Sequence, residues 1–148
     1  MQSIKKYIIL IIGFLFLMNN CAYSQNYSDR IYIIGNDFDT KSFTKSEIAS
    51  IFKGKINNWN NGNRVTIVLI LNEDEYSSHA TKTIYNKTVN AVKKYWLGLV
   101  FQGRFEAPVF VNTNDEVLAV IKRNKGSIGI LVDYNKNIDP KLTLNIDD

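Results

Sequence analysis

The apolar run from Val65 to Leu71 limits the possible folds of this chain more than any other feature. It lies in the segment RVTIVLIL (64–71), which is rich in β-branched residues and apolar almost throughout. A strand with this pattern is covered on both faces, as in a parallel sheet between two layers of helices. We therefore expect a three-layer α/β domain.

Helical patterns alternate with further strand patterns along the chain. Thr44 with Glu47 and Thr113 with Glu116 have the spacing of a capping box, which marks the start of a helix. A stripe of apolar residues over 85–99 predicts one longer helix that ends at Gly103. Short apolar runs predict strands at 31–34, 107–112, 127–133 and 142–146. The alternation predicts a single α/β lobe with a mostly parallel sheet and no dividing linker.

The N-terminus has the pattern of a secretory signal. Lys5 and Lys6 precede an apolar run of 12 residues, 7–18, which is too short for a comfortable membrane span. Ala22 and Ser24 are the small residues expected before a cut at Gln25. We therefore expect a signal peptide over 1–24, a single domain over 25–148, and an exported, periplasmic protein.

Cys21 raises the alternative of a lipoprotein. A lipobox carries small residues just before its cysteine, whereas Asn19 and Asn20 stand there in this chain. We therefore favour a soluble exported product over a lipid anchor, and both over an uncleaved signal. A cut after Ser24 leaves no cysteine, which excludes disulfides and thiolate catalysis in the mature chain.

The charge of the mature chain gives no sign of nucleic-acid binding. Removal of Lys5 and Lys6 from the 18 Lys and Arg residues leaves 16 against 14 Asp and Glu, a net charge of +2. The longest basic segment is KRNK (122–125), which is too little for the basic face that a nucleic acid requires.

Few residues are suited to catalysis or metal binding. His79 is the single histidine, so no second histidine can form a catalytic relay or a metal pair with it. The acidic run NEDE (72–75) lacks the alternating spacing of a calcium loop and is better explained as a solvated turn. We expect neither an enzyme nor a bound metal or cofactor.

A binding role fits the order of the elements better. In open α/β sheets, ligands bind beyond the carboxyl ends of the strands, where helices begin with free amides. The buried strand at 64–71 leads into NEDEYSSHAT (72–81) and then into a helix. Ser77, Ser78 and Thr81 could therefore cap that helix or offer hydroxyl groups to an anion.

Two segments resemble a known family. The segment FTKSEIASIFKGKINNWNNG (43–62) fits a motif with an apolar IF pair, a Gly-Lys and a Trp, and 93–133 continues with a Trp, FQG, a Pro and a GSIGI turn. With these motifs, residues 31–133 resemble the periplasmic phosphate-binding proteins of ABC transporters. The resemblance implies one lobe of the periplasmic type II binding-protein fold, whose members hold an oxyanion with backbone amides and hydroxyl groups.

The chain departs from this family at the loop expected to hold the anion. The family has an Arg followed by Ser-Gly-Thr there, and the corresponding place is between Leu71 and Tyr85. Thr81 can match the Thr, with His79 and Ala80 in place of Ser-Gly, or Ser77 and Ser78 take that role. The Arg is missing and three carboxylates precede these residues. Each repels a bound anion by about 1 kcal/mol per charge pair at 4 Å in bulk water.

Two hypotheses follow from the sequence. The first is a solute-binding domain for phosphate or another small oxyanion, with Ser77, Ser78, His79 and Thr81 as candidate ligand-binding residues and a membrane transporter, channel or sensor as partner. The alternative is an exported accessory protein that keeps the lobe as a scaffold without a ligand site. Trp59 is interpreted as a packing anchor rather than a ligand-stacking residue.

Overall fold

The computed structural model describes residues 31–37, 42–134 and 136–147. The predicted signal peptide, 1–24, and its Cys21 lie outside these residues. Within the described part of the chain, no helix is both long and apolar enough to cross a bilayer.

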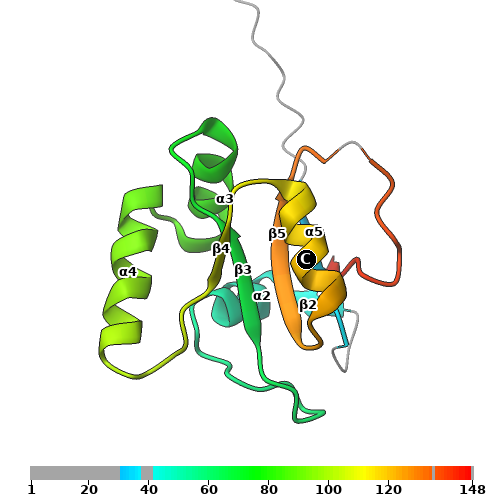
Figure 1. Ribbon diagram of the computed structural model, residues 1–148, viewed down its shortest axis with the longest axis horizontal. Coiled ribbons are helices and arrows are strands. Elements are labelled where there is room, and N and C mark those ends of the chain that lie inside the picture. The colour runs from blue at the N-terminus through cyan, green and yellow to red at the C-terminus, as the bar shows by residue number, and fades with distance from the viewer. Residues whose placement is uncertain (1–30, 38–41, 135, 148) are drawn as a thin grey trace, which may run out of the picture.

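A four-stranded sheet forms the centre of the domain (Figure 1). Its strand order is β1-β5-β3-β4. The bounds are Ile31–Gly35 for β1, Thr66–Ile70 for β3, Val109–Val111 for β4 and Ser127–Val132 for β5. β3 is parallel to both β4 and β5, whereas β1 is antiparallel to β5. The prediction of a mostly parallel sheet is therefore confirmed, with β1 as the exception.

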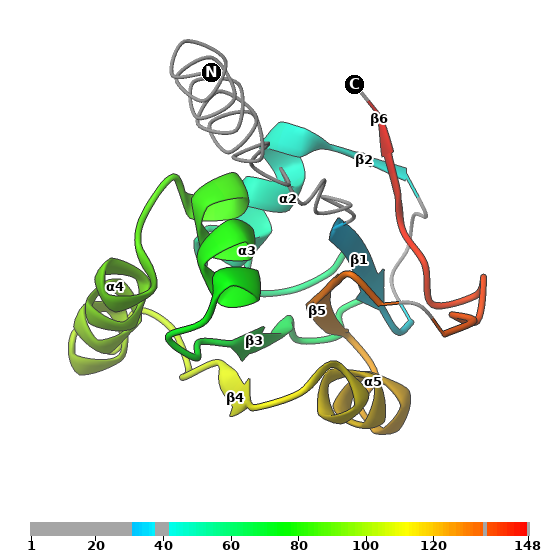
Figure 2. The same cartoon turned by 90° about the horizontal axis from the view of Figure 1, so that it is seen from above.

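Helices cover both faces of this sheet. α2 (Lys45–Phe52), α3 (Glu75–Tyr85) and α4 (Val89–Phe101) lie on one side, and α5 (Asn114–Arg123) lies on the other (Figure 2). Two apolar clusters correspond to these layers: Ile67 and Leu69 of β3 belong to the cluster of α2, α3 and α4, whereas Val68 belongs to that of α5. The buried run at 64–71 thus faces helices on both sides, and the predicted three-layer lobe is confirmed.

The predicted capping box at the start of α2 is present. The Thr44 hydroxyl accepts a hydrogen bond from the Glu47 amide at 3.2 Å, and the Glu47 carboxylate accepts one from the Thr44 amide at 2.8 Å. At the start of α5 only half of the pattern forms. Thr113 caps the Glu116 amide, but the Glu116 carboxylate accepts from the amide of Asn112, one residue earlier than a capping box requires.

The single long helix predicted over 85–99 is wrong, because α3 and α4 are separate helices. Asn86 adopts a left-handed backbone conformation with φ 52° and ends α3. Thr88 then caps α4 by accepting a hydrogen bond from the Ala91 amide at 3.3 Å. The apolar stripe continues across this break, so its periodicity alone gave no sign of it. Gly103 follows the end of α4 with φ 63°, as predicted.

A second sheet of two short strands lies beside α2. It consists of β2 (Ser42–Thr44) and β6 (Asn145–Asp147), which are parallel. The strand predicted at 142–146 therefore begins three residues later than expected, and the sequence pattern gave no indication of β2.

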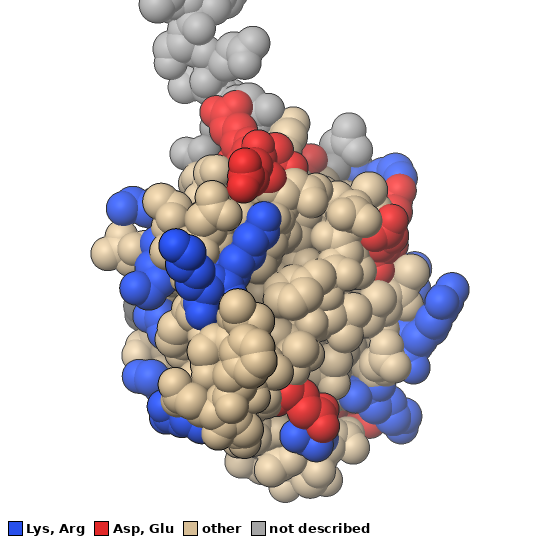
Figure 3. Space-filling model, turned by 60° about the vertical axis from the view of Figure 1, so that its left-hand side comes forward, with Lys and Arg blue, Asp and Glu red and all other residues tan. Residues whose placement is uncertain are grey.

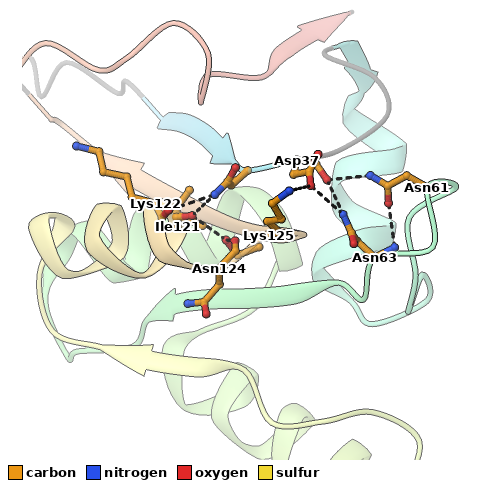
Figure 4. Close-up of polar contacts among 9 residues, drawn as sticks. Asp37, Asn61, Asn63, Ile121, Lys122, Asn124 and Lys125 are labelled. Carbon is orange, nitrogen blue, oxygen red and sulfur yellow. Dashed lines mark hydrogen bonds and ion pairs between the residues drawn. The ribbon is translucent and has the colours of Figure 1, made fainter.

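The asparagine-rich loop holds the amino-terminal end of the sheet together. The Trp59 side chain is buried and donates from Nε1 to the Gly126 carbonyl at 2.8 Å, so it is the packing anchor expected from the sequence. Asp37 connects the same regions: Asn61 and Asn63 donate hydrogen bonds to it, and Lys125 forms an ion pair with it at 3.2 Å (Figure 4). The motif that marks the family thus has a structural role, at the opposite end of β3 from NEDEYSSHAT.

Candidate functional site

The carboxyl ends of the parallel strands meet at one edge of the sheet, where α3 and α5 begin. A cavity of about 160 Å³ opens there. Its walls come from the ends of β3 and β5, the loop between β4 and α5, and the first turns of α3. This is the place where open α/β sheets bind their ligands. Of the four residues predicted from the sequence, Ser77 and Thr81 line this cavity.

Ser77 is the most unusual polar residue of the cavity. Its side chain is only 2% exposed. Among the described residues, its Oγ atom has no hydrogen-bond partner. A buried hydroxyl is normally paired, because an unmatched one costs about 1–3 kcal/mol. A ligand that accepts or donates one hydrogen bond in the cavity would relieve this cost.

The prediction that Ser77, Ser78 and Thr81 cap α3 is wrong. Asp74 is the N-cap residue, and its Oδ1 atom accepts a hydrogen bond from the Ser77 amide at 2.7 Å. The helix therefore begins within the acidic run, and the three hydroxyl groups lie inside its first turns. The Thr81 hydroxyl donates to the Ser78 carbonyl at 3.2 Å, so it already has a partner.

Ser78 and His79 lie on a different wall. They line a second cavity, of about 310 Å³, together with Lys82 of the same helix and Asp133 at the end of β5. The Asp133 Oδ1 atom is buried without a hydrogen-bond partner among the described residues. The structure thus divides the four predicted residues between two cavities, which share Tyr76 and Val132 as wall residues.

Three asparagines around the cavity did not appear among the predicted residues. Asn112 and Asn114 line it, and Asn72 lies at the end of β3. Asn72 donates to the Asn112 carbonyl at 3.0 Å, and Asn114 donates to the Val132 carbonyl at 2.9 Å. These bonds hold the ends of β3, β4 and β5 in place. A signal existed in the sequence, because Asn72 directly follows one predicted strand and Asn112 ends another, and the carboxyl ends of these strands must share one edge.

Tyr85 also lines the cavity, and two hydrogen bonds hold its side chain in place. Its hydroxyl donates to the Phe52 carbonyl at 2.8 Å and accepts from Trp96 Nε1 at 3.1 Å, which connects α3 to α2 and α4. Burial raises the pKa of the Tyr85 hydroxyl well above its usual range. The hydroxyl therefore stays protonated and keeps both hydrogen bonds. These bonds fix the position of α3, which carries Ser77.

The electrostatic character of the cavity is acidic. Its lining includes the Asp74 carboxylate but neither Lys nor Arg among the described residues. Glu73 and Glu75 flank Asp74 in the chain and are exposed. A site with this charge could hold an anion only through hydrogen bonds and the first amides of α3. The nearby carboxylates would repel the anion. In the described part of the chain, no group of three His, Cys, Asp or Glu residues is arranged to bind a metal ion.

Comparison with known proteins identifies the lobe. The family model of the PBP superfamily domain matches residues 19–143. Among solved structures, PstS from Borrelia burgdorferi is 19% identical with a TM-score of 0.56, and an ABC-type phosphate transport receptor from Vibrio cholerae is 19% identical with a TM-score of 0.52. A putative phosphate ABC transporter substrate-binding protein from Clostridium perfringens, solved with bound phosphate, is also 19% identical, with a TM-score of 0.50.

The similarity covers most of this chain but only part of each relative. In all three comparisons it covers 80% of this chain, whereas it covers 47%, 46% and 45% of the respective solved chains. The chain therefore spans about half the length of these proteins. A search of curated proteins found no match.

Proposed function

The chain belongs to the PBP superfamily, and from this premise we propose that it is an exported solute-binding domain for phosphate or another small oxyanion. In this proposal the ligand occupies the cavity at the carboxyl ends of β3 and β5. A membrane transporter, channel or sensor receives the loaded domain. The similarity to a phosphate transport receptor and to a putative phosphate ABC transporter substrate-binding protein supports a transporter. The proposal is for binding without catalysis.

The buried Ser77 hydroxyl is the observation that carries the proposal. It lies on the cavity wall without a partner among the described residues, in the first turn of α3. A buried hydroxyl donor near the start of a helix is suited to one oxygen of a small oxyanion.

The acidic surroundings set the expected strength of binding. Because no Lys or Arg lines the cavity in the described residues and Asp74 faces it, we expect dissociation constants in the millimolar range. A single lobe also covers its ligand from one side only, and tight sites bury most of the ligand surface.

Titration calorimetry of the protein purified after export, with phosphate and with sulfate, tests the proposal. We expect measurable binding that Ser77→Ala weakens by about tenfold, because a hydrogen bond to a charged group contributes about 1.5–3 kcal/mol. Ser78→Ala, which changes the second cavity, and Thr83→Ala, at an exposed position of α3, serve as matched controls and should leave the affinity unchanged. Absence of both heat and thermal shift at tens of millimolar anion, or loss of binding in Ser78→Ala alone, contradicts the proposal.

One observation favours the alternative of an accessory protein that keeps the lobe as a scaffold. The Asp74 carboxylate already accepts the hydrogen bond of the Ser77 amide at 2.7 Å, so this amide is not available to an anion. If this alternative holds, neither anion binds, and Ser77→Ala changes only the stability of the fold.

A further inference from the structure

Most of the exposed large apolar side chains of the described residues lie on two neighbouring elements, α4 and β4. In the described residues, all exposed large apolar side chains except Tyr76 belong to α4 or β4. They are Leu97, Val100, Phe101, Val109 and Phe110, with exposed fractions between 36% and 81%. Apolar side chains gathered in this way mark a surface for interaction, whereas single exposed ones do not.

A groove of about 450 Å³ lies between α4 and β4. Leu97 and Val100 form its α4 side, and Pro108 and Phe110 form its β4 side. Figure 3 shows this face of the molecule, with uncharged surface across its middle and charged side chains around it. Phe101 is the most exposed of the apolar residues, at 81%, but it does not line the groove.

β4 is an edge strand, and its outer edge adjoins the groove. It pairs only with β3 in the four-stranded sheet of the described residues. Its three residues are all apolar, whereas soluble proteins usually protect an exposed edge with charged residues. An edge of this kind offers main-chain groups to an added strand.

Two lysines give the groove a charged end. Lys93 and Lys94 line it and are exposed, and no carboxylate of the described residues lies within ion-pair distance of either. α4 and β4 run in opposite directions, so the first half of α4 lies beside the end of β4 (Figure 1). Both lysines are therefore near Asn112, which also lines the groove.

We propose that this groove is a docking site for an extended segment of a partner protein, which adds to β4 as a strand and places carboxylates against Lys93 and Lys94. Main-chain hydrogen bonds to β4 supply affinity, and every second side chain of the segment is apolar and lies on Leu97 and Val100. The two lysines favour a segment with an acidic end over segments of other charge. Their attraction to its carboxylates becomes stronger where water is excluded.

Four synthetic peptides of nine residues test this docking site by fluorescence anisotropy. Each alternates Val and Thr over seven residues and carries two Glu or two Lys residues at its N- or C-terminus. A strand parallel to β4 brings its C-terminus to the lysines, and an antiparallel strand brings its N-terminus there. We expect one Glu peptide to bind at least about tenfold more tightly than its Lys counterpart, and hydrogen exchange of residues 107–112 to slow in its presence.

Matched variants separate docking from general stickiness. Leu97→Glu and the double variant Lys93→Glu with Lys94→Glu should each lower the affinity for the bound peptide by about tenfold or more. Phe101→Glu replaces an exposed apolar residue of the same helix that does not line the groove, and it should not change the affinity for the peptide. Failure of all four peptides at millimolar concentration, equal binding of Lys peptides, or an equal effect of Phe101→Glu overturns the proposal. A dimer in sedimentation that Leu97→Glu dissociates also overturns it, in favour of a second copy of this chain.

Discussion

At the residue scale, Ser77 has a proposed role in binding and a cost in stability. Its hydroxyl is buried on the cavity wall without a partner among the described residues. We expect Ser77→Ala to raise the free energy of unfolding of the unliganded protein by about 1 kcal/mol, because it removes an unmatched polar group. Urea denaturation measures this change, with Ser78→Ala as the control. A Ser77→Ala protein that is less stable than the wild type would show that the hydroxyl has a stabilising partner.

Asp74 caps α3, and in the proposed site its charge opposes anion binding. Asp74→Asn keeps a good N-cap residue and removes the negative charge. Because one charge pair at 4 Å is worth about 1 kcal/mol in bulk water and more where water is excluded, phosphate affinity should rise by about fivefold or more. Calorimetric titration of both proteins checks this, with Glu73→Gln, at an exposed position outside the cavity lining, as the control. An unchanged affinity in Asp74→Asn would place the anion elsewhere.

The sequence predicts individual residues well where their role is local. The capping by Thr44 and Thr113 and the position of Gly103 depend on the chain close to them, and the structure has them as expected. Ser77 and Ser78 are adjacent in the chain, and no local rule tells which of them is buried. The difference arises from the way α3 packs on β3 and β5, because Ser77 faces the sheet.

At the scale of elements, the break between α3 and α4 depends on Asn86. Its φ of 52° is a conformation that Asn tolerates and β-branched residues do not. We expect Asn86→Val to reduce the free energy of unfolding by about 1–2 kcal/mol, and Asn86→Gly to leave it nearly unchanged. Thermal and urea denaturation check both variants. Equal stability of the Val and Gly variants would contradict the left-handed conformation.

At the scale of elements, β3 and α5 could be predicted from the sequence, and β2 could not. The strand β3 was evident from its continuous run of apolar, β-branched residues, and α5 from the spacing of Thr113 and Glu116 that marks its start. β2 has three residues and pairs with β6, which lies about a hundred residues further along the chain. No property of three residues predicts such a pairing, since it depends on where the rest of the fold places them.

At the scale of the whole molecule, the two ends of the sheet have different roles. Trp59, Asp37 and Lys125 hold the amino-terminal end together by hydrogen bonds and an ion pair. The carboxyl end carries the cavity and the unmatched Ser77 hydroxyl. The family motif therefore marks the stabilising end of the lobe, and the segment in which the sequence departs from the family lies at the end proposed to bind the solute.

The central claim is that a small oxyanion binds at the carboxyl end of the sheet, against Ser77. Titration of ¹⁵N-labelled protein with phosphate, followed by two-dimensional NMR of the backbone amides, tests it most directly. We predict saturable shifts at Tyr76, Ser77 and Asn114, and none at Asn61 or Lys125 of the opposite end. Shifts confined to the opposite end, or no saturable shift at tens of millimolar phosphate, would contradict the claim.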